Sequence, residues 1–367
     1  MSPHHAALHT RICDLFGIEV PIVQTGMGWV AGPRLAAATS SAGGLGILAA
    51  ATMTLPQLRE AIADVKRRTD KPFGVNFRAD QPDAVERAEL IIAEKVRVAS
   101  FAQAPARPLI KKLKDAGVLT MTTVGARRHA EKVADWGLDA LIAQGHEGGG
   151  HTGAVPTTLL LPQVVDAVPR IPVLGAGGFF DGRGLVAALA YGAAGIAMGT
   201  RFLLTQESRV PEAVKKVYLD TQVTGTVVTR AVDGQPQRVI RTDLIEKLER
   251  SGRVSGWVRA LRHAWHFRNL TGVSFWALFR AGREMHASQG LSWSQVAMAA
   301  NAPMLTRAAL VDGRTDVGVL PTGQVAGVIQ ELPTVAELVA RIMAEAEEAL
   351  VRLQAAPAAT LRMAAKS

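Results

Sequence analysis

The sequence predicts a (β/α)8 TIM barrel with a helical, basic insertion after its eighth strand. Eight short runs rich in Val, Ile and Leu recur before residue 206, longer Ala-rich stretches with charges at helical spacing lie between them, and the pattern then stops. Strands that alternate with helices form a parallel sheet buried on both faces, so such strands are continuous apolar runs. Eight units of this kind favour a closed barrel.

The predicted elements follow one another in regular order. The strands are Ile22–Met27, Leu45–Ala50, Phe73–Arg78, Val96–Phe101, Val118–Val124, Ala140–Gly145, Pro172–Gly178 and Gly195–Leu203. The helices between them include Leu55–Arg68, Asp83–Glu94, Pro108–Ala116, Ala126–Trp136 and Gly182–Tyr191. An open doubly wound sheet is the competing fold, and it usually carries a G-x-G-x-x-G turn between a strand and a helix. The one literal match, Gly148–Gly153, leads to Pro156 and three leucines, so we expect a loop there.

After the eighth strand the composition changes. Residues 206–301 are largely polar and basic, contain four of the six Trp residues, and have helical periodicity, which predicts an insertion or a small substrate-binding domain. Residues 302–356 are expected to return to the barrel core, which covers residues 10–205. This last part carries a loop at Gly323 and Gln324 and a closing helix from Pro333 to about Leu353.

The positive charge is concentrated in one region. The net charge is +9 at pH 7, and the segment from Val228 to Arg283 holds eleven basic and four acidic residues. A solvated helical face and a binding site for an anion both explain this excess. A nucleic-acid partner is not predicted, because the segment contains no zinc finger, basic zipper or RNP-type motif.

Cysteine content and hydropathy indicate the compartment. The single cysteine, Cys13, excludes an internal disulfide and a thiolate zinc site, and no spacing of His, Asp and Glu predicts a metal site. The first 30 residues lack the apolar core of a signal peptide, and the most apolar stretch, Leu185–Gly199, is shorter than the roughly 20 residues of a spanning helix. We therefore expect a cytoplasmic protein without a membrane partner. The sequence does not decide between a monomer and a homodimer.

Amides and glycines collect where the predicted strands end, which is the active face of such a barrel. Gln24, Asn76 and Gln144 would place amides in an apolar interior, where a buried amide needs hydrogen-bond partners. The edge of a heteroaromatic ring would supply these partners, and so would the loop backbone. Glycine-rich turns after strands seven and eight let backbone N–H groups approach a phosphate, although tight turns alone also use glycine. These turns contain Gly177, Gly178, Ala197, Met198, Gly199 and Thr200. Phosphate turns and amides together favour FMN as the cofactor.

The segment 145–153 contains five glycines and two histidines. His151 follows three glycines, so its imidazole has room beside it for a planar ligand. Imidazole exchanges a proton near neutral pH, which makes His151 the candidate catalytic base. A structural or surface role is the alternative for His151 and the expected role for His146.

Three motifs in this order resemble the nitronate monooxygenase family of FMN-dependent barrels. They are Gly-Val-Asn-Phe at 74–77, Gln-Gly-x-Glu-x-Gly-Gly-His at 144–151 and Met-Gly-Thr at 198–200. The resemblance covers residues 10–205 and returns at Gly323 with the final helix. It implies that FMN is held by Asn76, Gln144, Gly149, Gly177 or Gly178 and residues 197–200, with Gly26 and Met27 beneath the isoalloxazine. It also implies that His151 takes the α-proton of the substrate.

Two departures point to a subgroup of that family. Thr152 stands where these monooxygenases usually have Arg, and the basic insertion is larger. Together with Gln-Thr-Gly-Met-Gly-Trp-Val-Ala-Gly at 24–32 and Gly-Gly-Phe-Phe-Asp-Gly-Arg-Gly at 177–184, they resemble enzymes acting on coenzyme A thioesters of the last two steroid rings. Arginines of the insertion would then hold the coenzyme A phosphates.

The resemblance therefore implies an FMN-dependent oxidoreductase that moves a hydride between flavin N5 and a carbon near a ketone or thioester. A nitronate monooxygenase that oxidises alkyl nitronates with O2 is the first alternative. A non-redox barrel that binds or isomerises a phosphorylated ligand is the second.

Overall fold

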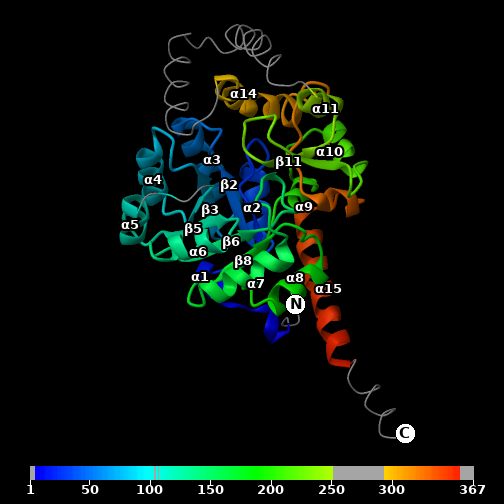
Figure 1. Cartoon of the computed structure of the whole chain (residues 1–367). Helices are drawn as coiled ribbons and strands as arrows, with labels where there is room; N and C mark the ends of the chain where they lie inside the picture. The colour runs from blue at the N-terminus through cyan, green and yellow to red at the C-terminus, as the bar shows by residue number, and fades with distance from the viewer. Residues whose placement is uncertain (1–4, 103–104, 106, 251–292, 356–367) are drawn as a thin grey trace, which may run out of the picture. The chain divides into compact units, whose positions relative to one another are not determined.

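A computed structural model of the protein describes residues 5–102, 105, 107–250 and 293–355, and within 293–301 it describes the backbone alone. The chain forms two compact units (Figure 1). The barrel unit comprises residues 1–148, 153–209 and 328–367. The second unit comprises residues 149–152 and 210–327.

Eight parallel strands close into a ring in the barrel unit, which confirms the predicted (β/α)8 barrel. Their order is β1-β2-β3-β4-β5-β6-β8-β9, and β1 pairs with β9 to close the ring. The strands are β1 (Ile22–Gln24), β2 (Leu45–Ala49), β3 (Phe73–Phe77), β4 (Val98–Phe101), β5 (Leu119–Val124), β6 (Ala140–Gln144), β8 (Val173–Ala176) and β9 (Gly195–Met198).

Helices connect the strands and cover the outer face of the barrel (Figure 1). Before β1 the chain forms η1 (Ala6–Leu8) and α1 (Arg11–Phe16). The helices after it are α2 (Pro33–Ser41), α3 (Leu55–Arg68), α4 (Ala84–Ala93), α5 (Arg107–Asp115), α6 (Arg127–Ala134), α7 (Thr157–Ala167), α8 (Gly182–Ala190), α9 (Thr200–Leu203) and the closing helix α15 (Val335–Ala355).

Helix α3 illustrates how the sequence sets these elements. The Thr54 hydroxyl accepts from the Gln57 N–H at 3.4 Å, and the Gln57 side chain accepts from the Thr54 N–H at 2.8 Å. This capping box satisfies backbone donors that a helix start leaves open. Leu58 and Ile62, spaced one turn apart, are fully buried, so the helix places its apolar side in the core.

The second unit contains a small antiparallel sheet of order β10-β11-β7. Its elements are β7 (Gly150–His151), α10 (Glu212–Leu219), β10 (Thr226–Thr229), β11 (Gln237–Ile240), α11 (Asp243–Arg250), α14 (Trp293–Leu310) and η2 (Gln324–Val328), which runs one residue beyond the unit. Val232, Val239, Ile245 and Val319 form its apolar cluster.

Four expectations need correction or stay open. The eighth strand ends at Met198, and Thr200–Leu203 is helical because Gly199 ends the extended segment. The insertion at 206–301 is not confirmed as helical, since β10 and β11 lie in it and residues 251–292 lie outside the described residues. The loop expected at 145–153 contains the short strand β7. The domain limits 10–205, 206–301 and 302–356 stay predictions.

Across the described part of the chain, the helices lack the combination of length and apolar character that a membrane span requires.

Candidate active site

Four neighbouring strands carry most of the predicted cofactor residues to one end of the barrel. Strands β6, β8, β9 and β1 follow one another round the ring and run parallel. The paired residues are Gln144 with Ala176, Ala176 with Ala197, and Gln24 with Met198. The glycine pair 177–178 and the tripeptide 198–200 therefore leave adjacent strands at the same carboxyl-terminal rim, and residues 25–27 leave the next strand.

Two of the three predicted amides lie at this rim. Asn76, in β3, donates from Nδ2 to Ser100 Oγ at 3.2 Å, and its side chain lies against Gly26. Gln144 ends β6, and its amide packs against the backbone of Gly148. Both residues are half-buried, so they combine hydrogen-bonding capacity with access from the rim.

The third amide, Gln24, is fully buried in the barrel wall. Its Nε2 donates to the carbonyl oxygens of Ile47, at 3.1 Å, and of Thr25, while its Oε1 accepts from the Ile47 N–H at 3.3 Å. These bonds use both amide hydrogens, so Gln24 joins β1 to β2 through the backbone. Its contact with a cofactor stays a prediction.

The turn after β8 requires glycine at two successive positions. Gly177 and Gly178 have φ angles of +91° and +87°, in the region that other residues adopt only under strain. A Cβ on Gly177 would lie 3.0 Å from the Gly148 N and 3.1 Å from the Gly145 O. The turn therefore keeps its backbone bare and close to the loop after β6, as a phosphate cradle needs.

Glu147 and Thr157 hold this turn in place, and neither residue was predicted to have a role in the site. The Glu147 carboxylate accepts from the Thr157 N–H at 2.9 Å, where α7 begins. The Thr157 hydroxyl lies 2.8 Å from Glu147 Oε2 and 2.9 Å from the Gly177 carbonyl oxygen, so its hydrogen serves both acceptors. The carboxylate also lies at the positive end of the helix dipole. Two signals for these residues were available in the sequence: Glu147 is the third residue after the end of β6, and Thr157 is the first residue of a helix.

The segment after β1 contains a strained residue. Trp29 has a φ of +65°, which is rare for a bulky side chain. The guanidinium of Arg209 donates from Nε to the Trp29 carbonyl oxygen at 2.7 Å, and burial lowers the pKa of Arg209. Val30 and Ala31 both donate to the Met27 carbonyl oxygen, so the segment that carries Gly26 and Met27 is held in one conformation.

His151 lies in the second unit, where strand β7 pairs with β11 and aligns His151 with Gln237. Its Nε2 lies 2.7 Å from Asp233 Oδ2, and the hydrogen bond requires the imidazole N–H to donate to the carboxylate. The His151 side chain is 63% exposed and that of Asp233 is 12% exposed. The carboxylate therefore orients an accessible imidazole and selects the tautomer in which Nδ1 is the basic nitrogen.

Asp233 is ionised in this arrangement. Burial alone would raise its pKa, but the hydrogen bond and charge of His151, the Gln235 N–H and the Gln237 side chain together lower it below its ordinary value. The Gln235 N–H donates to Asp233 Oδ1 at 3.0 Å. Asp233 was not predicted as a site residue; the available signal was the Asp-Gly pair at 233–234 between two apolar runs, which is typical of a hairpin turn.

Gly149 also lies in the second unit. A Cβ there would meet the backbone of Thr322 and Gly323, at 2.5 Å and 2.6 Å, so the close approach of these segments excludes a side chain. The structure thus groups Gly149 with His151, while the other predicted cofactor residues belong to the barrel unit. A role of Gly149 in cofactor binding stays a prediction.

The residues at the rim fit a phosphorylated flavin. The bare turn at 177–178 suits a phosphate, and the amides of Asn76 and Gln144 suit the edge of a heteroaromatic ring. Among the described residues, there is no group of three or more His, Cys, Asp or Glu side chains that could hold a metal ion. Cys13 is buried in α1, and burial raises the pKa of its thiol, so its thiolate is disfavoured.

Comparison with known proteins identifies the family. The family model described as nitronate monooxygenase matches residues 9–345. A relative from Mycobacterium tuberculosis strain H37Rv, named (3aS,4S,5R,7aS)-5-hydroxy-7a-methyl-1-oxo-octahydro-1H-indene-4-carboxyl-CoA dehydrogenase, is 59% identical over 96% of this chain and 99% of its own. A probable nitronate monooxygenase from Staphylococcus aureus strain MSSA476 is 32% identical over 65% of this chain and 80% of its own.

A solved structure supports the same assignment. FabK from Thermotoga maritima superposes with a TM-score of 0.78 at 35% identity, covering 94% of this chain and 98% of that one. The family match spans nearly the whole sequence, and the strand-end motifs lie where the barrel places its active face. The protein is therefore a flavin-dependent oxidoreductase that belongs to the nitronate monooxygenase family.

Proposed function

We propose that this protein is an FMN-dependent dehydrogenase of a coenzyme A thioester whose acyl group is a fused-ring ketone. The substrate class follows the name of the relative that is 59% identical over nearly the full length of both chains. The relative named as a nitronate monooxygenase is much less similar, at 32%. The surplus of basic residues between Val228 and Arg283 supports a polyanionic substrate such as coenzyme A.

FMN would be held at the carboxyl-terminal rim of the barrel. The turns at 177–178 and 198–200 would bind its phosphate, and Asn76 and Gln144 would hydrogen-bond its ring system, with Gly26 and Met27 beneath it. When bound, FMN supplies the two-electron redox chemistry that no side chain of the chain provides.

The imidazole–carboxylate pair of His151 and Asp233 carries the proposal for catalysis. Asp233 accepts the hydrogen bond from Nε2, so Nδ1 of His151 accepts or returns the proton of the carbon next to the substrate carbonyl. The carbonyl acidifies that carbon, which allows one imidazole to act as the base. Asp233 stabilises the imidazolium that forms when the proton is taken.

A titration under anaerobic conditions tests the proposed function. We expect the purified protein to be yellow and to release FMN on denaturation. A ring-bearing acyl-coenzyme A should bleach the flavin band, whereas a small alkyl nitronate should not. Bleaching by the nitronate with rapid O2 use would favour a nitronate monooxygenase, the function that the family match supports second. A colourless protein that rejects added FMN would overturn both redox functions and leave the phosphorylated-ligand barrel.

The cellular location belongs to the same proposal. We place the protein in the cytoplasm, because its single cysteine, Cys13, is buried as a free thiol and the coenzyme A thioester is an intracellular type of metabolite.

A further inference from the structure

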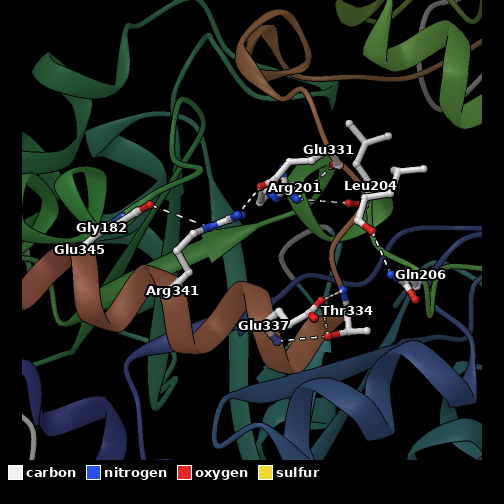
Figure 2. Close-up of polar contacts among 10 residues, drawn as sticks. Gly182, Arg201, Leu204, Gln206, Glu331, Thr334, Glu337, Arg341 and Glu345 are labelled. Atoms are coloured by element: carbon white, nitrogen blue, oxygen red, sulfur yellow. Dashed lines mark hydrogen bonds and ion pairs between the residues drawn. The ribbon is translucent and has the colours of Figure 1, made fainter.

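Arg201 is a buried cation immediately after the rim residues 198–200. It lies in the short helix α9 and is only 3% exposed. Its Nη2 donates to the carbonyl oxygens of Leu204, at 3.3 Å, and of Glu331, at 3.4 Å. Its Nε is buried and has no hydrogen-bond partner in the described part of the chain. Arg201 thus joins α9 to the segment that leads into α15 (Figure 2).

The nearby carboxylates are engaged by a second arginine. Arg341 of α15 forms ion pairs with Glu331 and, at 3.8 Å, with Glu345 (Figure 2). No ion pair joins Arg201 to a carboxylate among the residues that the structure describes. Burial, reinforced by the charge of Arg341, lowers the pKa of Arg201 to about 10, although Glu331 and Glu345 oppose the shift. Arg201 therefore remains a cation at neutral pH, and Glu331 and Glu345 act on it electrostatically without a direct ion pair.

The same cluster contacts the helix that follows the other glycine turn. Glu345 Oε2 accepts from the Gly182 N–H at 2.9 Å, at the start of α8, four residues after Gly178. The closing helix therefore connects, through Arg341 and Glu345, to the element that follows 177–178 and, through the Glu331 segment, to the element that follows 198–200 (Figure 2). An uncompensated buried cation is costly unless an anion offsets it.

We propose that Arg201 is a positioning residue for the phosphate group of the flavin: it anchors the turn 198–200 to the segment before α15, and its buried charge, which has no direct ion pair among the described residues, favours a phosphate dianion at that turn. This inference rests on the proposed binding of FMN. It predicts a selective effect, because riboflavin has the same ring system as FMN and lacks the phosphate. Arg201 should therefore contribute to FMN affinity and not to riboflavin affinity.

The test compares flavin affinities of apoprotein variants. Arg201→Met removes the charge at similar volume, and Arg201→Lys keeps the charge while losing the planar donor fork. Arg183→Met is the matched control, because Arg183 lies in α8 near the same rim but is 67% exposed and paired with Asp181. Dissociation constants for FMN and riboflavin are measured by quenching of flavin fluorescence, and melting temperatures of the apoproteins report folding.

We expect Arg201→Met to weaken FMN about tenfold or more and riboflavin less than about twofold, since hydrogen bonds and charge pairs with ionised groups contribute more than neutral ones. Arg201→Lys should retain FMN within about threefold, and Arg183→Met within about twofold because an exposed charge is screened. If Arg201→Met folds poorly, Arg201→Gln serves in its place, because it also removes the charge while keeping a hydrogen-bond donor, and it should likewise weaken FMN about tenfold and riboflavin less than about twofold.

Equal weakening of both flavins, or no weakening of either, would overturn the inference and leave Arg201 a structural residue. A wild-type protein that binds neither flavin would overturn the proposed function and the inference with it. A wild-type protein that binds FMN while the Arg201 variant without the charge weakens FMN and riboflavin equally, or neither, would overturn the inference alone.

Discussion

At the residue scale, His151 and Asp233 show how the proposed catalytic pair is assembled from distant parts of the sequence. They are 82 residues apart and meet because β7 pairs with β11, with Asp233 in the turn that precedes β11. The glycines before His151 predicted an accessible imidazole, and it is accessible. Its partner could not be predicted, because a strand of two residues containing glycine leaves no periodic pattern.

Replacing the imidazole should separate catalysis from cofactor binding. We expect His151→Ala to lower turnover with the acyl-coenzyme A by about two to four orders of magnitude, because it removes the general base. The FMN content of the purified variant should equal that of the wild type, since the proposed phosphate turns lie in the barrel unit. Steady-state turnover and flavin absorbance measure both. His129→Ala, an exposed histidine of α6, is the control and should change neither. Unchanged turnover in His151→Ala would return His151 to a structural role.

Asp233→Asn tests the carboxylate without changing its shape. We expect turnover to fall by about tenfold to a thousandfold, because the amide no longer stabilises the imidazolium or fixes its tautomer. Substrate binding should change little, so kcat should carry most of the loss. Turnover equal to that of wild type would show that Asp233 is not needed to orient His151.

The same variant has a pH signature in stability. The pKa of Asp233 is lower in the folded state than in the unfolded state, where it is about 3.9. The ionised carboxylate therefore contributes fully to the free energy of unfolding well above that pH. This contribution is lost as the pH falls through the lower pKa of the folded state. We expect the wild type to exceed Asp233→Asn in free energy of unfolding at pH 7, with the difference shrinking below about pH 4. Denaturant titrations from pH 3 to pH 7 measure this. A difference that grows toward acid would contradict the assignment.

At the scale of elements, the start of α7 links the loop after β6 to the glycine turn after β8, which is the proposed phosphate site. The link is the Thr157 hydroxyl between Glu147 and Gly177. Thr157→Val keeps the shape but leaves these half-buried acceptors without that donor, and we expect FMN affinity to fall about tenfold, corresponding to about 1–2 kcal/mol. Thr157→Ser restores the hydroxyl and should stay within about threefold of wild type. Fluorescence titration with FMN measures the difference, and equal losses in the two variants would exclude the hydroxyl as the cause.

The contact between α8 and α15 depends on a residue without a side chain. A Cβ on Gly182 would overlap the backbone of α15 at Ile342 and Ala346. We expect Gly182→Ala to lower the free energy of unfolding by about 1–3 kcal/mol, as overpacking does. Gly184→Ala, two residues further along α8, is the control: a Cβ there would lie 3.2 Å from the Phe179 ring, a side chain, and would not overlap helix backbone. Denaturant titration compares the two, and equal stabilities would show that the helices adjust without cost.

The barrel elements were predictable because each strand of a parallel sheet is a buried apolar run. The predicted strand Leu45–Ala50 is observed as Leu45–Ala49, and the predicted helix Leu55–Arg68 is observed with the same bounds. The eighth run was predicted too long, since Phe202 and Leu203 are as apolar as strand residues but lie in α9. Hydropathy cannot distinguish a buried helical turn from a strand over four residues. The N–H groups of Phe202 and Leu203 both donate to the Gly199 carbonyl oxygen, which makes this segment helical.

At the scale of the whole molecule, the sequence predicted which end of the barrel is functional. Parallel strands must present all their carboxyl ends on one rim, so Asn76, Gln144 and the two glycine turns were placed there from their positions in the chain alone. The hydrogen bonds that hold the rim join residues that are far apart in the sequence, so they were not predicted. Arg201 with Glu331 and Arg209 with Trp29 are separated by 130 and 180 residues, which no local pattern records.

The distribution of charge over the whole chain leads to a prediction about substrate binding. The basic surplus between Val228 and Arg283 includes Arg230, Arg238 and Arg241, whereas Arg253 and the arginines up to Arg283 lie outside the described residues. If this surplus attracts the phosphates of coenzyme A, the KM for an acyl-coenzyme A should rise with ionic strength, by about threefold to tenfold between 0.05 M and 0.5 M salt.

The matched substrate is the same acyl group on N-acetylcysteamine, which keeps the thioester and removes every phosphate. Its KM should be higher at low salt and almost independent of salt, while kcat at saturation should be similar for both substrates, because the reacting carbon is unchanged. Initial rates at five or more salt concentrations give both slopes. Equal slopes for the two thioesters would show that salt acts on the protein itself, and that the basic segment binds no phosphate of the substrate. A slope confined to the coenzyme A thioester would assign the segment's charge to substrate capture.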